Sequence, residues 1–100
     1  MSTSPSSTKP EIQVIRQPDQ DFLDKEGVFS WGTWGCDVSK FPWSYDSNES
    51  CYLLKGKVTV TPTDGRNPAS FEAGDFVTFP AGMSCTWDVS EGVHKHFKFF

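Results

Sequence analysis

Glu49, Cys85 and Tyr45 carry the side chains of this sequence that are best suited to chemistry. Glu49 offers a carboxyl group for acid–base work, Cys85 a thiol that can act as a nucleophile, and Tyr45 a phenol that could assist either. Cys51 follows Glu49 by two residues in a predicted strand, so both side chains should point to one face. We treat Glu49, Cys85 and Tyr45 as the candidate catalytic residues.

Aromatic residues and one lysine complete the predicted site. Alternation in the predicted strand Cys85–Val89 puts Trp87 on the same face as Cys85. In the last predicted strand it puts Lys95 on the more apolar face, where an ammonium group needs a carboxylate or must reach the rim. The predicted ligand-binding set is Trp43, Tyr45, Glu49, Cys51, Cys85, Trp87 and Lys95. An apolar pocket with a few converging polar groups is typical of a small-molecule site.

Each of these residues also has a structural explanation. Glu49 and Lys95 could form a buried ion pair, the indoles could fill the core, and either thiol could be an inert small hydrophobe. His94 and His96 share a strand face and are expected at the surface or against a partner subunit. If the alternation is shifted by one residue, His96 replaces Lys95 in the pocket, and the sequence leaves that choice open.

Short strands separated by turns must position these side chains. Nine Phe, four Trp and two Tyr favour sheets. Turns are predicted at Asp64-Gly65, Ala73-Gly74-Asp75, Pro80-Ala81-Gly82 and Ser90-Glu91-Gly92. The predicted strands are Val28–Asp37, Cys51–Leu54, Lys57–Thr61, Ser70–Glu72, Phe76–Phe79, Cys85–Val89 and Val93–Phe100. One short helix is predicted over Pro18–Glu26, with Gly27 closing it.

Composition and charge limit the kinds of partner and the cellular location that we expect for this chain. The net charge is −4 and the nine Lys and Arg residues are scattered, so nucleic acid is not an expected partner. No apolar run approaches the ~20 residues of a membrane helix. Three cysteines without CxxC spacing and no secretory signal favour a cytoplasmic location. Residues 1–10 are predicted to be a disordered tail. Their serine-rich, acid-free composition also suits an organelle transit peptide, but they are few and lack arginine.

Two motifs resemble the paired signature of the cupin superfamily. Glu49 and Gly56 are separated by six residues, as at the end of the first cupin motif, and Gly74, Pro80 and Gly82 have the spacing of the second. The resemblance implies an all-β fold, a single cupin (jelly-roll) β-barrel over residues 11–100.

The metal ligands of that superfamily are mostly absent from these motifs. Trp43 and Tyr45 stand where the first motif has histidines, Cys85 replaces the histidine of the second, and Val89 replaces its asparagine. Only Glu49 of the four expected ligands is kept. A divalent metal needs several converging donors, so we expect no cofactor, and a bound divalent metal is the disfavoured alternative.

Residues 28–100 further resemble the short single-domain cupins related to the cupin domain of ureidoglycine aminohydrolase. The similar strings are Trp34-Gly-Cys, Lys40-Phe-Pro-Trp-Ser-Tyr, Glu49-Ser-Cys-Tyr-Leu-Leu-Lys-Gly-Lys-Val, Ala73-Gly-Asp-Phe-Val-Thr-Phe-Pro-Ala-Gly-Met-Ser-Cys-Thr-Trp and Lys95-His-Phe. That enzyme uses manganese to release ammonia from a ureide. Its metal ligands do not carry over beyond Glu49, so the resemblance implies the fold without supporting the reaction.

Three functions fit these observations. The first is a metal-free pocket for a small polar or aromatic metabolite, oriented by Glu49 and Lys95. The second is an enzyme acting on a nitrogen-bearing or carbonyl small molecule, with Glu49 as acid or base and Cys85 or Tyr45 assisting. The third is a structural or interaction module with a vestigial pocket, which could pair as a homodimer through exposed strand edges.

Overall fold

The computed structural model describes residues 9–100, so the predicted tail over residues 1–10 lies outside the described residues except for Lys9 and Pro10. The described elements comprise seven strands, one α-helix and one 3-10 turn. In chain order they are β1 (Gln13–Ile15), α1 (Gln20–Glu26), η2 (Val28–Ser30), β2 (Gly32–Cys36), β3 (Ser39–Ser44), β4 (Glu49–Pro62), β5 (Ala69–Glu72), β6 (Phe76–Phe79) and β7 (Ser84–Phe99). The predicted all-β fold with one short helix is confirmed.

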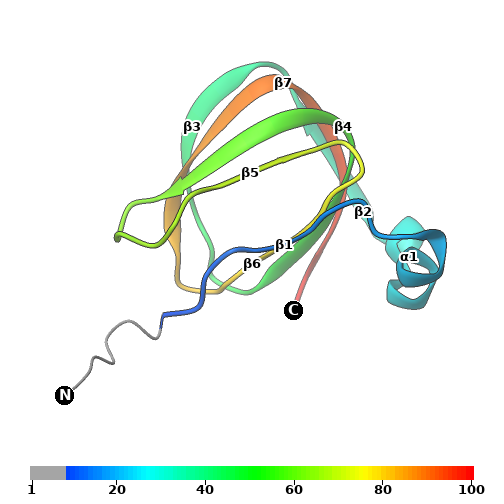
Figure 1. The fold of residues 1–100 in the computed structure, drawn as a ribbon. Helices are drawn as coiled ribbons and strands as arrows, with labels where there is room; N and C mark the ends of the chain where they lie inside the picture. Colours follow the sequence, from blue (N-terminus) through cyan, green and yellow to red (C-terminus); the bar gives the residue numbers. More distant parts are fainter. Residues whose placement is uncertain (1–8) are drawn as a thin grey trace.

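All strand pairs are antiparallel, and the two long strands β4 and β7 organise the sheet. The strand order is β1-β6-β4-β7-β2, with β3 added to β7 and β5 added to β4. The sheet curls so that the strands surround a common interior, and α1 lies outside it at one end (Figure 1). This curvature lets β2, β3, β4 and β7 present side chains to the same space.

Two predicted breaks are wrong, because β4 and β7 run continuously through them. The predicted strands Cys51–Leu54 and Lys57–Thr61 form one strand, β4, and the predicted turn Ser90-Glu91-Gly92 continues β7. The pairing of β4 with β7 accommodates three register shifts between Leu53 and Val58. Bulges of this kind bend a strand without ending it, so turn-forming residues do not mark a turn here.

The structure also contains strands that the sequence pattern missed. Part of the predicted strand Val28–Asp37 is the 3-10 turn η2, so β2 begins only at Gly32. β1 and β3 were not predicted. β3 contains Pro42, which cannot donate a backbone hydrogen bond, and β3 pairs only with β7 among the described strands. An edge position tolerates that proline, whereas propensity alone argues against a strand.

Helix α1 begins and ends close to the predicted bounds. The side chain of Asp19 accepts a hydrogen bond from the backbone N–H of Phe22 at 3.0 Å and caps the first turn. Gly27, with φ at 71°, closes the last turn. Leu23 packs with Val28 and Phe76 in a small apolar cluster, which anchors the helix to the outside of the sheet.

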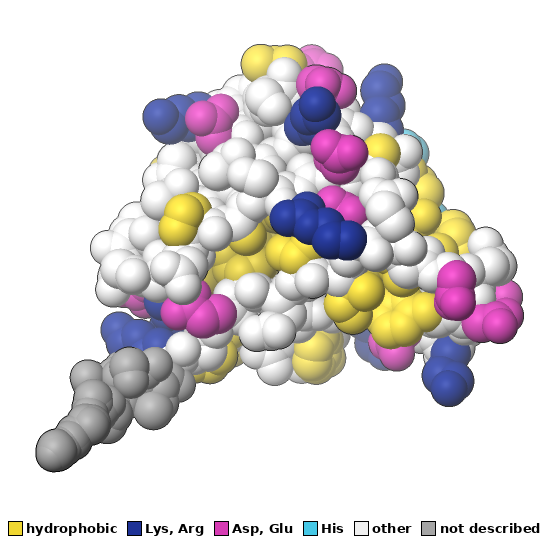
Figure 2. Space-filling view, viewed as in Figure 1, with side chains coloured by type: hydrophobic (Ala, Val, Ile, Leu, Met, Phe, Trp, Pro, Cys, Tyr) yellow, Lys and Arg dark blue, Asp and Glu magenta, His cyan; other side chains and the backbone are white. Residues whose placement is uncertain are grey.

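The main core fills the interior of the curled sheet. Its buried members alternate with exposed residues along β4 and β7, as the period of two requires. They are Tyr45, Cys51, Leu53, Val58, Val60, Phe71, Val77, Phe79, Met83, Cys85, Trp87, Val89 and Val93. On the face shown in Figure 2, charged side chains of both signs are scattered. Apolar side chains are visible at the centre of this face and beside α1.

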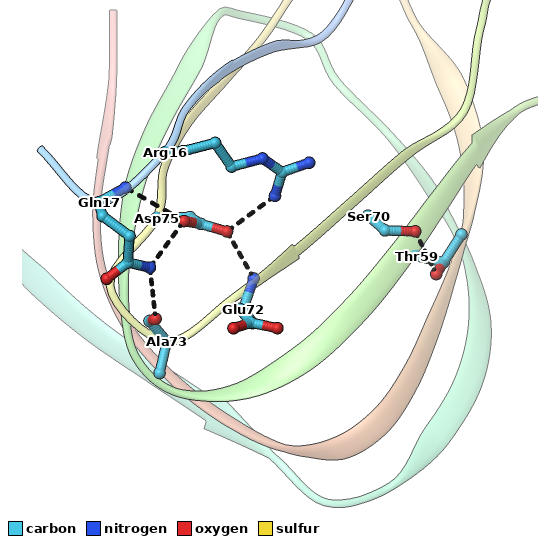
Figure 3. A network of polar contacts seen from close by, with 7 residues as sticks. All are labelled: Arg16, Gln17, Thr59, Ser70, Glu72, Ala73 and Asp75. Carbon is cyan, nitrogen blue, oxygen red and sulfur yellow. Dashed lines mark hydrogen bonds and ion pairs between the residues drawn. The ribbon is translucent and has the colours of Figure 1, made fainter.

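Asp75 connects the segment after β1 to the turn between β5 and β6 through hydrogen bonds (Figure 3). Its carboxylate accepts hydrogen bonds of 2.9 Å from the Arg16 guanidinium, the Gln17 side-chain amide and the Glu72 backbone N–H. The Gln17 amide also donates to the Ala73 carbonyl. Burial raises the pKa of the Asp75 carboxyl, but these hydrogen bonds outweigh burial and hold that pKa below its usual value.

Candidate functional site

An aromatic cavity of about 180 Å³ lies between β2, β3, β4 and β7. Seven of its lining side chains are aromatic and two are charged. They are Trp34, Phe41, Trp43, Tyr45, Glu49, Trp87, Lys95, Phe97 and Phe99. Trp43 and Phe99 are 48% and 49% exposed, whereas Glu49 and Lys95 are 3% and 5% exposed. The cavity therefore has an exposed aromatic rim and a buried charged floor.

The floor consists of an ion pair between Lys95 and Glu49. The Lys95 ammonium donates a hydrogen bond of 2.9 Å to Oε2 of Glu49. The same ammonium lies 4.7 Å from the ring centroid of Trp87, 5.2 Å from that of Trp34 and 6.0 Å from that of Phe97. These rings present the negative part of their quadrupole to the cation. Carboxylate and aromatic faces together compensate the ammonium for its lost hydration.

Tyr45 lines the cavity beside this pair. The hydroxyl oxygen accepts a hydrogen bond of 3.1 Å from the indole N–H of Trp87, and the ring stacks on Phe79. Burial, and then the negative charge of Glu49, raise the pKa of the phenol far above its ordinary value. The hydroxyl stays protonated, and within residues 9–100 its hydrogen has no acceptor, so it keeps the capacity to donate one hydrogen bond.

The two predicted thiols are buried and do not line the cavity. Cys51 and Cys85 are 0% and 1% exposed. The Cys85 thiol donates to the backbone carbonyl of Trp43 at a distance of 3.6 Å. Burial raises the pKa of Cys51 to about 12 and that of Cys85 to about 11, with the charge of Glu49 adding to both shifts. Neither thiol is a thiolate near neutral pH, so neither is a ready nucleophile.

The structure brings five of the seven predicted ligand-binding residues into one cavity: Trp43, Tyr45, Glu49, Trp87 and Lys95. It also answers the question that alternation left open in the last strand. Lys95 faces the cavity, whereas His96 lies on the opposite face of β7 with its ring 5.5 Å from that of Phe29. His94 is exposed on that same face.

Sequence reasoning missed four cavity residues: Trp34, Phe41, Phe97 and Phe99. Phe97 and Phe99 follow Lys95 at intervals of two on the inward face of β7, a signal that could have found them. Trp34 pairs with Lys95 across β2 and β7, a register that depends on folding. Phe41 lies in the unpredicted strand β3 and stacks with Trp87.

The donors present here do not fit the metal that cupin barrels commonly hold. Among the described residues, no group of three or more His, Cys, Asp or Glu side chains is arranged to hold a metal ion. One oxygen of Glu49 already bonds Lys95, whose positive charge would repel a cation. Cys85 does not line the cavity, and the phenol oxygen of Tyr45 accepts a hydrogen bond from the Trp87 indole. The side chains around Glu49 are therefore arranged for an ammonium group instead.

No described helix is both long and apolar enough to cross a bilayer. The helix α1 has seven residues, of which only Leu23 is buried.

Comparison with known proteins identifies relatives of the chain. The profile of the EutQ-like cupin domain family matches residues 23–97. No curated protein gives a significant match. Among solved structures, a DUF861 family protein from Thermotoga maritima is 43% identical, with a TM-score of 0.84, and the match covers 90% of this chain and 100% of that one.

More distant structures share the fold. The EutQ protein of Clostridium difficile is 20% identical with a TM-score of 0.61, over 69% of this chain and 53% of that one. A Rhizobium leguminosarum protein of unknown function is 13% identical with a TM-score of 0.59, over 94% and 85% of the two chains. The predicted cupin fold is thus confirmed, while the specific resemblance to ureidoglycine aminohydrolase stays a prediction.

Proposed function

Because the chain belongs to the EutQ-like cupin domain family but keeps no metal-binding cluster among its described residues, we propose that it binds a small organic molecule. The binding site is the aromatic cavity, and the Glu49–Lys95 pair orients the ligand. The observation that carries this proposal is an open aromatic cavity with a buried ion pair on its floor.

The size of the cavity suits a ligand of one ring with a small substituent. Its volume is about 180 Å³, and a cavity of roughly 150 Å³ in another protein is enough to hold benzene. Two features favour occupancy by an organic molecule: the aromatic walls and an exposed rim at Trp43 and Phe99. A fully packed barrel would leave no such space, because protein interiors contain few voids larger than water.

Binding is better supported than catalysis by the same residues. The enzyme hypothesis needs Cys85 or Tyr45 to assist Glu49. Cys85 does not line the cavity, and both the thiol and the phenol hold their protons at neutral pH. Glu49 is engaged by Lys95 at 2.9 Å, which orients a carboxylate firmly. These contacts suit recognition of a ligand through fixed hydrogen-bonding groups.

The proposal is tested by NMR titration of the tryptophan indole N–H signals with a library of small aromatic metabolites. Trp34, Trp43 and Trp87 line the cavity, whereas Trp31 packs with the small cluster at α1 and serves as an internal control. A ligand should shift signals of the three cavity indoles and leave that of Trp31 unchanged. The proposal fails if no compound shifts the cavity signals, or if Trp31 responds as strongly as they do.

A further inference from the structure

Resting on the proposed function, we infer that the ligand is an uncharged planar molecule with a ring and an amide-type edge, meaning a carbonyl group next to an N–H group. Three features of the aromatic cavity lead to this ligand class. They are the neutral charge of its floor, the hydrogen-bonding groups that the floor leaves unused, and the flat aromatic walls.

Charge selects against ionic ligands. Glu49 and Lys95 are the only ionised side chains that line the cavity among the described residues, and their charges cancel. An anionic ligand would bring a second carboxylate next to Glu49, and a cationic ligand would bring a second ammonium next to Lys95. Either ion would also lose its hydration in a cavity with largely aromatic walls. A neutral molecule leaves the existing pair intact.

Hydrogen bonding selects for an edge with one acceptor and one donor. Oε2 of Glu49 accepts from Lys95, whereas Oε1 has no recorded donor within residues 9–100 and can accept from a ligand N–H. The Tyr45 hydroxyl hydrogen and the further N–H groups of Lys95 can donate to a ligand carbonyl. An amide edge satisfies both needs at once, and a ligand that lacks it leaves buried polar groups unpaired.

The walls select for a flat ligand. Phe41 and Trp87 stack with an interplanar angle of 15°, and Trp34 meets both of them edge-on. Flat faces and edges of this kind pack well against another ring. The Lys95 ammonium already occupies a position over the Trp34 and Trp87 rings, so these rings have no need of a cationic ligand.

Benzamide, benzoate and benzylammonium have the same ring and differ in charge, so they test the inference directly. We expect benzamide to shift the indole signals of the cavity and to bind at least about tenfold more tightly than either ion. If benzoate or benzylammonium binds as tightly as benzamide, the ligand class is wrong and the proposed cavity site stands. If none of the three shifts the cavity indoles, the ligand class is wrong, and the library titration then decides separately whether the cavity binds any small molecule.

A double variant tests whether the ion pair causes the preference. Glu49→Leu combined with Lys95→Met keeps the bulk of both side chains and removes the polar floor. Toluene, with the same ring and no amide, should then bind as well as benzamide, whereas the wild type should prefer benzamide. The matched control is Lys57→Met with Glu91→Leu, which removes an exposed pair of the same residue types 3.6 Å apart. An unchanged preference in the Glu49 and Lys95 variant, or its loss in the control, would overturn the inference.

Discussion

At the scale of single residues, Glu49 and Lys95 form a buried ion pair on the floor of the aromatic cavity. Both side chains are almost fully buried, at 4% and 6% exposure, so each depends on the other for compensation of its charge. The surrounding rings add to that compensation but cannot replace the carboxylate. Replacing both residues together should therefore cost little stability, whereas replacing only one of them should cost much more.

Stability measurements on the pair make this expectation quantitative. Glu49→Gln or Lys95→Met alone should lower the free energy of unfolding by about 3–5 kcal/mol, because one buried charge loses its partner. The double variant Glu49→Leu with Lys95→Met should cost much less than the sum of the two single changes. Urea unfolding at pH 7 measures all three. Removal of the exposed Lys57–Glu91 pair should change stability by under about 1 kcal/mol. If the double variant loses as much free energy of unfolding as the two single variants together, this account is wrong.

The buried thiols predict a loss of stability in alkali. Burial raises the pKa of Cys51 from its ordinary 9.0 to about 12, so above pH 9 the unfolded chain releases this proton while the folded chain keeps it. The free energy of unfolding therefore falls as pH rises from 9 towards 12, by up to about 1.4 kcal/mol per pH unit for this thiol. Urea unfolding between pH 8 and 10 should show a flatter decline for Cys51→Ala than for the wild type. Parallel declines would show that Cys51 is not responsible.

At the scale of elements, Gly56 allows β4 to bend while it stays paired with β7. Its φ is 103°, and a Cβ atom there would lie 2.5 Å from the carbonyl oxygen of Gly92 and 2.8 Å from that of Glu91. Gly65 has a similar φ of 90° in the β4–β5 turn, but no atom lies within 4 Å of the corresponding Cβ position. The two glycines share a backbone conformation and differ in the space around them.

This difference predicts unequal costs for the same substitution. Gly65→Ala should cost roughly 1 kcal/mol, the strain of a non-glycine residue in this conformation. Gly56→Ala adds a steric clash with the backbone of β7 and should cost at least about 2 kcal/mol more. Thermal and urea unfolding of both variants measure the difference. If both variants lose the same free energy of unfolding, β7 can move away from β4 without loss of stability.

At the scale of the whole molecule, the sheet has strand edges through which two copies could pair. Within residues 9–100, β1 pairs only with β6 and β2 pairs only with β7, so both strands have an edge without a partner. The homodimer predicted from the sequence would use such an edge. Sedimentation velocity over a range of concentrations should then show a species of twice the 11.2 kDa of one chain. A single 11.2 kDa species throughout the range would contradict the prediction.

The sequence by itself determined the class of fold, because strand alternation and turn signals are local patterns, and it also gave the prediction that the site is centred on Glu49. Alternation assigned Trp87 to the interior and favoured Lys95 over His96 without deciding between them, and the spacing of Glu49 and Gly56 supplied part of the resemblance to the cupin motifs. Helix α1 was also predicted, since Pro18 and Gly27 mark the two ends of a helix through local backbone preferences. These features need no knowledge of which strands become neighbours.

Only the tertiary structure decided which residues share the cavity. Trp34 reaches Lys95 through the β2–β7 register, and Phe41 belongs to an edge strand that carries a proline. Cys51 and Cys85 face inward as predicted, yet they are buried in the core instead of lining the cavity. Pairing register and sheet curvature are long-range properties, set by residues far apart in the chain. Alternation gives the side of a strand but not the neighbours that a side chain meets there.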